Sequence, residues 1–444
     1  MRILKFFVLV FFSSFLCANE LNKGLTPLGA NPAASNDGLI PAWKGAIPAN
    51  INFKSGDTYP DPYQDEAPVV KIDAKNYQTY QDKLTVGQIQ LFKKHPATFS
   101  MLIYPSHRAY RYHPEFEART AWNHGKSRLV GSIDGLQQYT GGIPFPVPNN
   151  GAEVIWNARL SQPTPVADAL YDEVAVFSKG NQQRHRSKLL IESPMAYEYH
   201  PIGKTADQIG DIAAFVFYEV LAPKRKKGEM VIVHEPIDQY KHDRKAWVYI
   251  PGAKRVKRAP NAGYDTPIGP GGLMTADDSM GFNGAMDRYD WQLVGKKPMY
   301  IPYHNYQFDR SDIGYETLLT KGHANPQYIR YELHRVWIVE ATLKGNNTHV
   351  YAKRRFYIDE DTWQIVAADM YDGRNELWRT SFNLSVYDFF LKGYITRAQL
   401  VYDFNASAYV AMRLVNETRP TQYAMETKGA DFYTPANLRK MGRR

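Results

Sequence analysis

Cysteine is almost absent from the chain, since Cys17 is the one example among 444 residues. No disulfide can form within the chain, so its stability must come from the burial of apolar surface. Long apolar runs are scarce as well. After the run of about a dozen residues that starts at Phe6, no apolar stretch comes near the roughly 20 residues that a membrane-spanning helix needs.

Familiar catalytic and metal-binding motifs are also missing. The sequence has no GxSxG elbow, no GxxxxGK[ST] phosphate loop, no HExxH pair and no EF-hand spacing. Its twelve histidines include no His-x-His pair, and His234-Glu235 is followed directly by a proline. We therefore expect no catalysis, no cofactor and no metal. An enzyme acting on lipid or glycan stays an alternative, because catalytic carboxylates can come from any part of a sequence.

The first residues match a secretory signal peptide. Arg2 and Lys5 give a basic start, the apolar run follows, and small or polar residues return at Ala18. We expect residues 1–18 to be the signal peptide, with cleavage after Ala18. A lipoprotein would keep Cys17 as its acylated first residue, but bulky residues precede this cysteine where small ones are usual. The sequence therefore predicts a soluble protein of a Gram-negative periplasm rather than an anchored lipoprotein.

Positive charge exceeds negative charge, with a formal net charge of +9. Such a balance favours anionic partners, and in the periplasm anionic lipid is a better candidate than nucleic acid. The densest basic run is Lys224, Arg225, Lys226 and Lys227. We interpret this run as a candidate docking patch for anionic headgroups or an acidic partner, which would allow peripheral membrane contact. A solvated cluster in a turn between two strands is the alternative.

Two segments precede the predicted sheet. Residues 19–72 are rich in Pro, Gly, Asn and Asp without a sustained period, which predicts an extended arm that lies over the fold. Residues 73–165 predict a helical and proline-rich cover. Apolar positions between Asp73 and His95 approximate helical spacing, and another helix is expected at 150–160. We expect arm, cover and sheet to form one structural unit.

From Val166 onward, short runs rich in Val, Ile, Tyr, Trp and Phe recur between turn signals, which is typical of consecutive antiparallel strands. The clearest runs are 170–178, 215–222, 229–234, 245–250, 255–259, 288–295, 332–343, 348–358, 363–371 and 377–388. Tight turns at 251–254, 359–361 and 372–375 would pair neighbouring strands. The sequence predicts a mainly β fold with added helices, in which residues 166–444 form a large curved antiparallel sheet or open β-barrel.

A long loop at 260–287 interrupts these strands and is too rich in Gly and Pro for an ordinary hairpin. We expect it to be functional or disordered, and it could cover a cavity. The loop contains Asp277-Asp278, and a later turn contains Asp359-Glu360-Asp361. Such carboxylates could act as acid and base or bind calcium, but we favour their interpretation as solvated turn residues.

Aromatic residues are abundant, with 31 tyrosines, 21 phenylalanines and 8 tryptophans. The candidates for the lining of an apolar, ligand-binding cavity are those on predicted strands: Trp247, Tyr249, Trp291, Trp337, Phe356 and Trp363. Ordinary sheet core is the alternative for the same residues. If they line a cavity, replacing Trp337 or Trp247 with alanine should weaken ligand retention more than folding stability.

Several long segments are distinctive: LTPLGANPAASNDGLIPAWKG, YPSHR, GGIPFPVPNNGAEVIWN, RKAWVYIPGAKRVKRAP, ELHRVWIVEATL and HVYAKRRFYIDEDTW. They closely resemble the bacterial family called domain of unknown function 1329 (DUF1329). A weaker similarity, in WVYIPG, KRVKR and YIDEDTWQIVAADMYD, is to the lipoprotein-localisation carriers LolA and LolB. Those carriers are open β-barrels closed by helices, and their concave side holds acyl chains.

The resemblance implies a periplasmic binding or carrier protein for a lipid or another hydrophobic ligand. Members of the family are often encoded near transporters of the resistance-nodulation-division (RND) type, which implies work with such a transporter. The alternative is an envelope scaffold that binds a transporter or outer-membrane protein through the arm and the long loop.

Overall fold

The structure is a computed structural model. It describes residues 24–47, 51–131, 133–162, 164–196, 199–259, 264–424 and 426–443. The expected signal peptide lies outside these residues. Within them, fifteen strands form one large sheet, and two pairs of short strands stand apart from it. The prediction of a mainly β fold is confirmed.

The strands of the large sheet are β1 (Val70–Asp73), β2 (Ser100–Ile103), β5 (Val166–Val176), β6 (Gln182–Glu192), β7 (Ile212–Ala222), β8 (Met230–Pro236), β9 (Lys245–Ile250), β10 (Arg255–Arg258), β13 (Tyr289–Pro302), β14 (Arg330–Leu343), β15 (Lys353–Asp359), β16 (Ile365–Tyr371), β17 (Leu377–Asp388), β18 (Gly393–Asp403) and β19 (Ala408–Ala424). The small pairs are β3 (Arg128–Val130) with β4 (Gly135–Gln137), and β11 (Pro267–Ile268) with β12 (Met274–Thr275).

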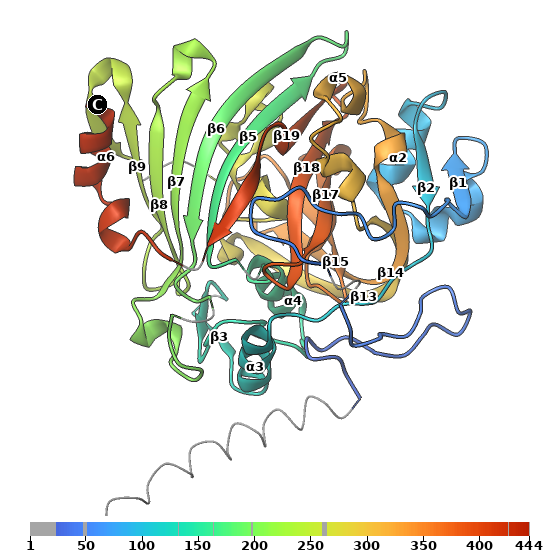
Figure 1. The fold of residues 1–444 in the computed structure, drawn as a ribbon, viewed down its shortest axis with the longest axis horizontal. Helices are drawn as coiled ribbons and strands as arrows, with labels where there is room; N and C mark the ends of the chain where they lie inside the picture. Colours follow the sequence, from blue (N-terminus) through green and yellow to red (C-terminus); the bar gives the residue numbers. More distant parts are fainter. Residues whose placement is uncertain are drawn as a thin grey trace, which may run out of the picture.

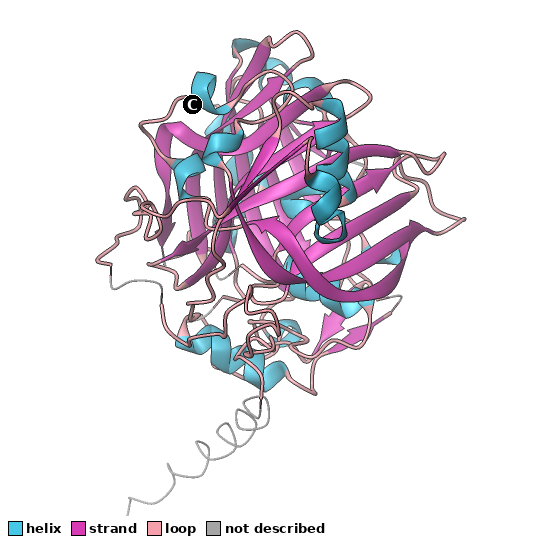
Figure 2. Ribbon diagram, turned by 90° about the vertical axis from the view of Figure 1, so that its right-hand side faces the viewer, coloured by secondary structure: helices cyan, strands magenta, loops and turns pink. Residues whose placement is uncertain are grey.

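The order of strands in the sheet is β1-β2-β14-β15-β16-β17-β18-β19-β5-β6-β7-β8-β9-β10, with β13 also paired to β14. The first and last strands of this order do not pair, so the sheet is open, as predicted. Figure 2 shows its strong twist. One pairing departs from the antiparallel prediction, because β2 lies parallel to β14, where Arg330 faces Leu102. The end of the predicted arm therefore contributes β1 to the sheet, and the predicted cover contributes β2.

Helices cover parts of the sheet. They are α2 (Val86–Lys94), α3 (Pro114–Asn123), α4 (Gly151–Arg159), α5 (Tyr315–Leu318) and α6 (Pro435–Gly442). The 3-10 helices are η1 (Tyr77–Lys83), η2 (Ala206–Gln208), η3 (Lys224–Lys226), η4 (Pro251–Ala253), η5 (Pro270–Gly272), η6 (Ala276–Gly281), η7 (Met286–Arg288), η8 (Tyr306–Asp309), η9 (Pro326–Tyr328) and η10 (Ala430–Tyr433). Polar caps fix the helix starts: Thr85 and Gln88 form a capping box on α2, and the Asn150 side chain accepts from the Glu153 N–H of α4.

Burial differs sharply along the sheet. Every residue of β16 and β18 is buried, so both faces of these strands are covered. The arm contributes to this cover, because Leu28 and Ile40 pack into the main core. In β7, by contrast, only Phe217 and Val220 are buried. Strands β5 to β9 stand as a wall on the left of Figure 1, with α6 on the outer side.

The sequence predicts no membrane-spanning helix after the apolar run that starts at Phe6. Among the described residues, none of the helices has the length and apolar character needed to cross a bilayer.

Candidate functional site

A cavity of about 1130 Å³ lies against the wall formed by β5 to β9. This volume is slightly above the roughly 300–1,000 Å³ of most ligand pockets. The 264–283 part of the long loop, the end of α4 and residues of β18 and β19 complete its lining. The described part of the loop that the sequence marked as functional or disordered, from Tyr264 onward, thus covers the cavity.

The wall of the cavity is built from cross-strand rows of small apolar residues. Ala167, Ile191, Val216, Val233 and Ala246 are successive partners across β5 to β9, and all five line the cavity. Side chains alternate between the two faces of a strand, so the residues between them point away from the cavity. The wall therefore offers a continuous apolar surface about five strands wide.

A second row runs beside the first. Leu189, Tyr218, Val231 and Val248 are successive partners across β6 to β9 and also line the cavity. Tyr218 accepts a hydrogen bond from the Ser187 hydroxyl at 2.8 Å, so the ring keeps a fixed place on the wall. The two rows together make the centre of the wall a continuous apolar surface.

One end of the wall is polar. Glu173 and His185, which are cross-strand partners, line the cavity there together with Lys226. Burial raises the pKa of Glu173 to about 7, because a carboxylate loses hydration in this enclosed position. Burial also lowers the pKa of His185, and the nearby Lys226 lowers it further. Near neutral pH, this end therefore holds a neutral histidine and a carboxyl that is partly protonated.

The opposite end of the wall contains an ion pair. Arg244 Nη2 lies 2.6 Å from Glu235 Oε1, and the same nitrogen donates to the Asn283 carbonyl at 3.2 Å. Arg159 lies near this pair and stacks on the ring of Trp156 at 4.5 Å. The Asn283 contact ties the end of the covering loop to the wall.

Buried charges fasten the covering loop to the sheet. Arg354 of β15 donates to Asp277 at 2.7 Å and to Asp278 at 2.5 Å, and all three side chains are buried. Burial alone would raise the pKa of Asp277, but Arg354, His349 and the Thr275 hydroxyl together outweigh this effect and lower it to about 2. The interpretation of Asp277-Asp278 as solvated turn residues is therefore wrong. These carboxylates are pairing partners for an arginine that is distant in sequence.

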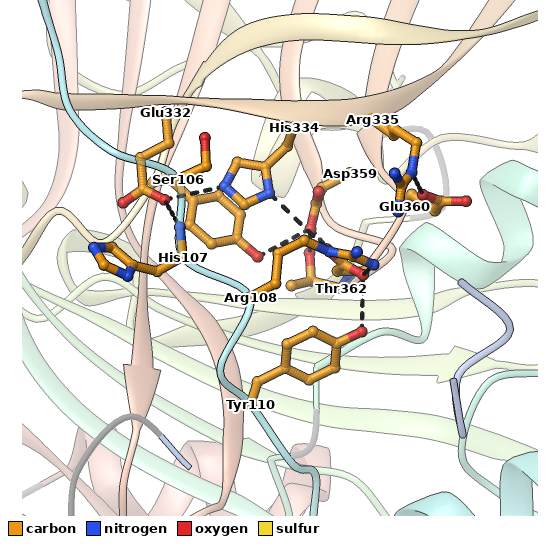
Figure 3. A network of polar contacts seen from close by, with 12 residues as sticks. Ser106, His107, Arg108, Tyr110, Glu332, His334, Arg335, Asp359, Glu360 and Thr362 are labelled. Carbon is orange, nitrogen blue, oxygen red and sulfur yellow. Dashed lines mark hydrogen bonds and ion pairs between the residues drawn. The ribbon is translucent and has the colours of Figure 1, made fainter. Parts of the chain in front are cut away.

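A second buried network fastens the N-terminal arm, and Figure 3 shows its members Arg108, Arg335 and Glu360. Arg108 donates to both oxygens of Asp361 at 2.7 Å, and also to the Asn31 carbonyl at 2.7 Å. Arg335 donates to the same carbonyl at 2.6 Å and to Glu360 at 2.5 Å. The two arginines therefore hold the arm against β14 and the turn after β15.

The solvated interpretation of Asp359-Glu360-Asp361 is wrong for the same reason. Asp359 is 0% exposed, Glu360 2% and Asp361 3%. Burial raises the pKa of Asp359 to about 6. The pKa of Asp361 is instead held far below its usual range, because Arg108 and His334 together outweigh the effect of burial. The ionisation of the carboxylates in this turn therefore depends on side chains that are distant in sequence.

The described residues contain one group with the spacing of a metal site, namely His334, Asp359 and Asp361, whose potential ligand atoms lie within 4.8 Å of one another. Arg108 already neutralises Asp361, and Tyr110 donates to it at 2.9 Å. Three protein donors, the backbone N–H and hydroxyl of Thr362 and the hydroxyl of Tyr303, share one oxygen of Asp359. The donor set therefore fits a fixed arm better than a bound cation.

The six predicted lining aromatics lie outside this cavity lining. On β9, Ala246 and Val248 face the cavity, while Trp247 and Tyr249 point to the other face. There the Tyr249 hydroxyl donates to the Gly442 carbonyl of α6 at 2.6 Å. Both aromatic side chains pack in the cluster that joins α6 to the outer face of the wall.

The other four aromatics belong to the main core. Trp291 and Phe356 pack on Phe282, which itself lines the cavity, with ring centroids 5.1 and 5.6 Å from it. Trp337 stacks on Trp363 at 6.1 Å, and Trp363 donates to the carbonyl of Leu28 in the arm at 2.8 Å. None of the six therefore marks the cavity, whereas the alternating small residues of β6 to β9 do.

The basic run forms η3 and its flanks, in the turn between β7 and β8. Lys224, Arg225 and Lys227 are exposed, and Lys226 contributes to the cavity lining. The run thus lies at the polar end of the wall, beside Glu173. Its role as a docking patch stays a prediction.

Together, the fold and the site define a class: a mainly β protein whose open, twisted sheet walls one large internal cavity. The family model described as "Protein of unknown function (DUF1329)" matches residues 71–439. The chain belongs to the DUF1329 family, which confirms the resemblance. It is also similar to "Uncharacterized protein PA3922" of Pseudomonas aeruginosa, with 38% identity over 440 residues that cover 96% of this chain and 93% of that protein.

Solved structures show weaker similarity. A DUF1329 family protein from Desulfovibrio piger matches with a TM-score of 0.44 and 12% identity, over 65% of this chain and 97% of that one. A putative outer membrane lipoprotein-sorting protein domain from Vibrio parahaemolyticus gives 0.43 and 12%, over 65% and 98%. A LolA superfamily protein from Nitrosomonas europaea gives 0.38 and 11%, over 65% and 98%. Matches of this degree carry no conclusion about function.

Proposed function

We propose that the protein binds and carries a hydrophobic ligand, a lipid or lipid-like compound, in the cavity against β5 to β9. The observation that supports this most is the pair of apolar rows that face a volume of about 1130 Å³. Apolar surface gains about 25 cal/mol per Å² when it leaves water, so a single acyl chain on this wall would bind without specific polar contacts. The proposal involves no covalent chemistry.

The proposed setting is the periplasm, reached by means of the signal peptide at residues 1–18. A carrier must exchange its ligand, and we propose an RND-type transporter or an outer-membrane protein as the exchange partner. The exposed residues Lys224, Arg225 and Lys227 support a docking role, because they lie beside Lys226 at the polar end of the cavity. Anionic lipid headgroups or an acidic partner surface would match their charge.

The test is to purify the mature protein from the periplasm without detergent and to analyse its organic extract by mass spectrometry. The decisive variant is Val233→Trp, because Val233 lies in the middle of the wall and a tryptophan there would occupy the space of the ligand. The matched control is Val294→Trp on β13, where the valine is 45% exposed to solvent.

We expect a hydrophobic species in stoichiometric amount from the wild type and the control, and little or none from Val233→Trp. Calorimetric titration with 1-dodecanol checks the same point with an added ligand. Equal occupancy of Val233→Trp and wild type would contradict the proposal. So would a clean extract from a wild-type protein that also fails to bind 1-dodecanol.

A further inference from the structure

Arg413 is placed in the cavity lining by a strained stretch of backbone. The pairing of β19 with β5 shifts register between Ala411 and Leu414, and Arg413 within this bulge has a φ of 65°. A left-handed conformation is costly for a residue other than glycine and persists only where the surroundings impose it. The bulge turns the half-buried guanidinium of Arg413 toward the cavity, which it lines beside Met412.

No carboxylate pairs with Arg413 among the residues that the structure describes. Its one recorded hydrogen bond runs from Nη1 to the sulfur of Met280 at 3.0 Å, and sulfur is a weak acceptor. Burial lowers the pKa of Arg413, and the positive charge of nearby Arg397 lowers it further. An arginine nevertheless stays protonated in proteins, so the enclosed charge has no counter-ion among the described residues.

The surroundings of Arg413 add to the excess of positive charge. Arg397 is paired with Asp309 at 3.2 Å, and it also donates to the Tyr423 hydroxyl at 3.0 Å. Its Nη2 is buried without a partner. Burial raises the pKa of Tyr423, and it holds that of Tyr171 well above the usual range. Both hydroxyls are therefore neutral, and the ion pair with Asp309 involves Arg397 rather than Arg413.

Arg159 lines the cavity at the far end of the wall and is a useful comparison, because carboxylates lie near its positive charge. No ion pair with Arg159 is recorded either, but Asp134 and Glu235 lie close enough to offset part of the lowering of its pKa by burial. Its guanidinium also stacks on Trp156 at 4.5 Å. No described carboxylate lies comparably close to Arg413. Its charge can therefore be balanced by an anionic group of a ligand that enters the cavity.

We propose that the ligand is an amphiphile with one anionic headgroup, a carboxylate or a phosphate monoester, and that Arg413 binds this headgroup. The inference rests on the proposed function, since the apolar part of the ligand must lie on the wall. The guanidinium would donate in a forked pair to two headgroup oxygens. Tyr423 lines the cavity near Arg413, and its neutral hydroxyl, which accepts from Arg397, can donate to the headgroup.

The position of the headgroup matches the apolar rows. Tyr171 and Tyr423 belong to β5 and β19, at the side of the cavity where the wall begins. From there Leu189, Tyr218 and Val231 extend across β6 to β8. A chain attached to a headgroup at Arg413 would therefore lie across the strands.

The test is calorimetric titration of the mature full-length protein with probes that share one chain and differ in headgroup. The probes are dodecanoate, dodecyl phosphate, neutral 1-dodecanol and cationic dodecyltrimethylammonium, each below its micelle concentration, and inorganic phosphate alone. A charge-assisted hydrogen bond is worth about a factor of ten or more in affinity. We expect both anionic amphiphiles to bind about tenfold tighter than 1-dodecanol, the cation to bind most weakly, and inorganic phosphate not to compete with dodecanoate.

Arg413→Gln should remove the preference for anionic probes while 1-dodecanol binds as before, which also shows that the variant is folded. Arg413→Lys keeps the charge and should keep most of the preference. Arg159→Gln, the matched change at the far end of the wall, should leave it intact.

Equal affinity of the wild type for all headgroups would overturn the anionic inference and leave the proposed carrier function standing. Persistence of the preference in Arg413→Gln, or its loss in Arg159→Gln instead, would overturn the assignment to Arg413. Competition by inorganic phosphate alone would point to a free anion rather than an amphiphile. Failure of every chain-bearing probe to bind would count against the carrier function itself.

Discussion

Strands β15 to β18 and strands β5 to β9 belong to the same sheet but have different roles. The first group forms core, and the second forms the wall of the cavity. Segments from elsewhere in the chain cover most of the first group, and every residue of β16 and β18 is buried, although Thr396 and Gln399 of β18 also line the cavity. The second group has α6 on one face and the cavity on the other. What covers a strand, rather than its own residues, thus decides whether it is core or binding wall.

Buried charged groups also have different partners in the two regions. In the filled region, buried arginines meet carboxylates directly, as Arg354 does with Asp277 and Asp278. In the cavity region, Arg413 has no carboxylate partner within the described residues, and Glu173 has only His185, with Nδ1 3.9 Å from Oε2; the pKa values of Glu173 and Arg413 shift toward the neutral form. Pairing stabilises a fixed structure, whereas uncompensated groups are free to respond to a ligand or to pH.

The largest effect is expected from breaking a buried ion cluster in the filled region. Arg354→Met would leave Asp277 and Asp278 buried without their cation, and should lower the free energy of unfolding by about 3–5 kcal/mol. Arg374→Met is the control, because its ion pairs are exposed and such pairs contribute about 0–1 kcal/mol. Urea unfolding followed by circular dichroism measures both. Equal losses would show that burial of the cluster is not what stabilises the loop.

Replacing a valine with alanine in each region tests whether the strands of the wall border empty space. Val339→Ala on β14 removes two methyl groups from a site that is 0% exposed, and should cost about 2–3 kcal/mol. Val216→Ala on the cavity wall should cost less than about 1 kcal/mol, because its methyl groups face space rather than packed atoms. A cost at Val216 equal to that at Val339 would mean that the cavity is filled in solution.

Stability should depend on pH through Glu173. Its folded pKa of about 7 lies above the ordinary value of 4.5, so the folded state binds more protons between these limits. The free energy of unfolding contributed by this group therefore falls as the pH rises from about 4.5 to about 7, by roughly 3 kcal/mol. Glu173→Gln should remove that fall. Asp359 and Asp369 also have pKa values raised to about 6, but they contribute equally to both proteins.

The measurement is urea unfolding of wild type and Glu173→Gln at about pH 5 and about pH 8. The difference between the two proteins isolates the carboxyl of Glu173. Parallel pH profiles would show that this carboxyl is not enclosed as the structure has it.

The smallest effect on stability is expected at the basic turn. Replacing Lys224, Arg225 and Lys227 with glutamine should change the free energy of unfolding by less than about 0.5 kcal/mol, because the three residues are exposed. Co-sedimentation with vesicles rich in anionic lipid should weaken, as the docking proposal requires. Unchanged sedimentation would remove the membrane part of that proposal.

Much of the fold follows from local sequence pattern. All ten predicted strands overlap observed ones, since runs of β-branched and aromatic residues between turn signals are a local feature. β6 was missed because its first half, QQRHRSK, is almost wholly polar. Its polar residues are tolerated since they lie at the end of the wall and at its solvent side.

The site was harder to predict, for a physical reason. Large aromatics such as Trp247 attract attention as ligand contacts, but a cavity exists where side chains are small, as at Ala246 and Val248. Which face of β9 is covered depends on α6, which follows about 190 residues later. In the same way, Asp361 looks solvated in its turn until Arg108 from a distant segment reaches it. Long-range partners of this kind leave no local signal.

The sheet ends at β10, whose one partner among the described strands is β9. A strand in that place presents backbone N–H and C=O groups that another molecule could pair with. Three of its four residues, Arg255, Lys257 and Arg258, are basic and exposed. Two copies that approached edge to edge would bring these charges together, so the ending of the sheet itself works against growth of the sheet from one molecule to the next.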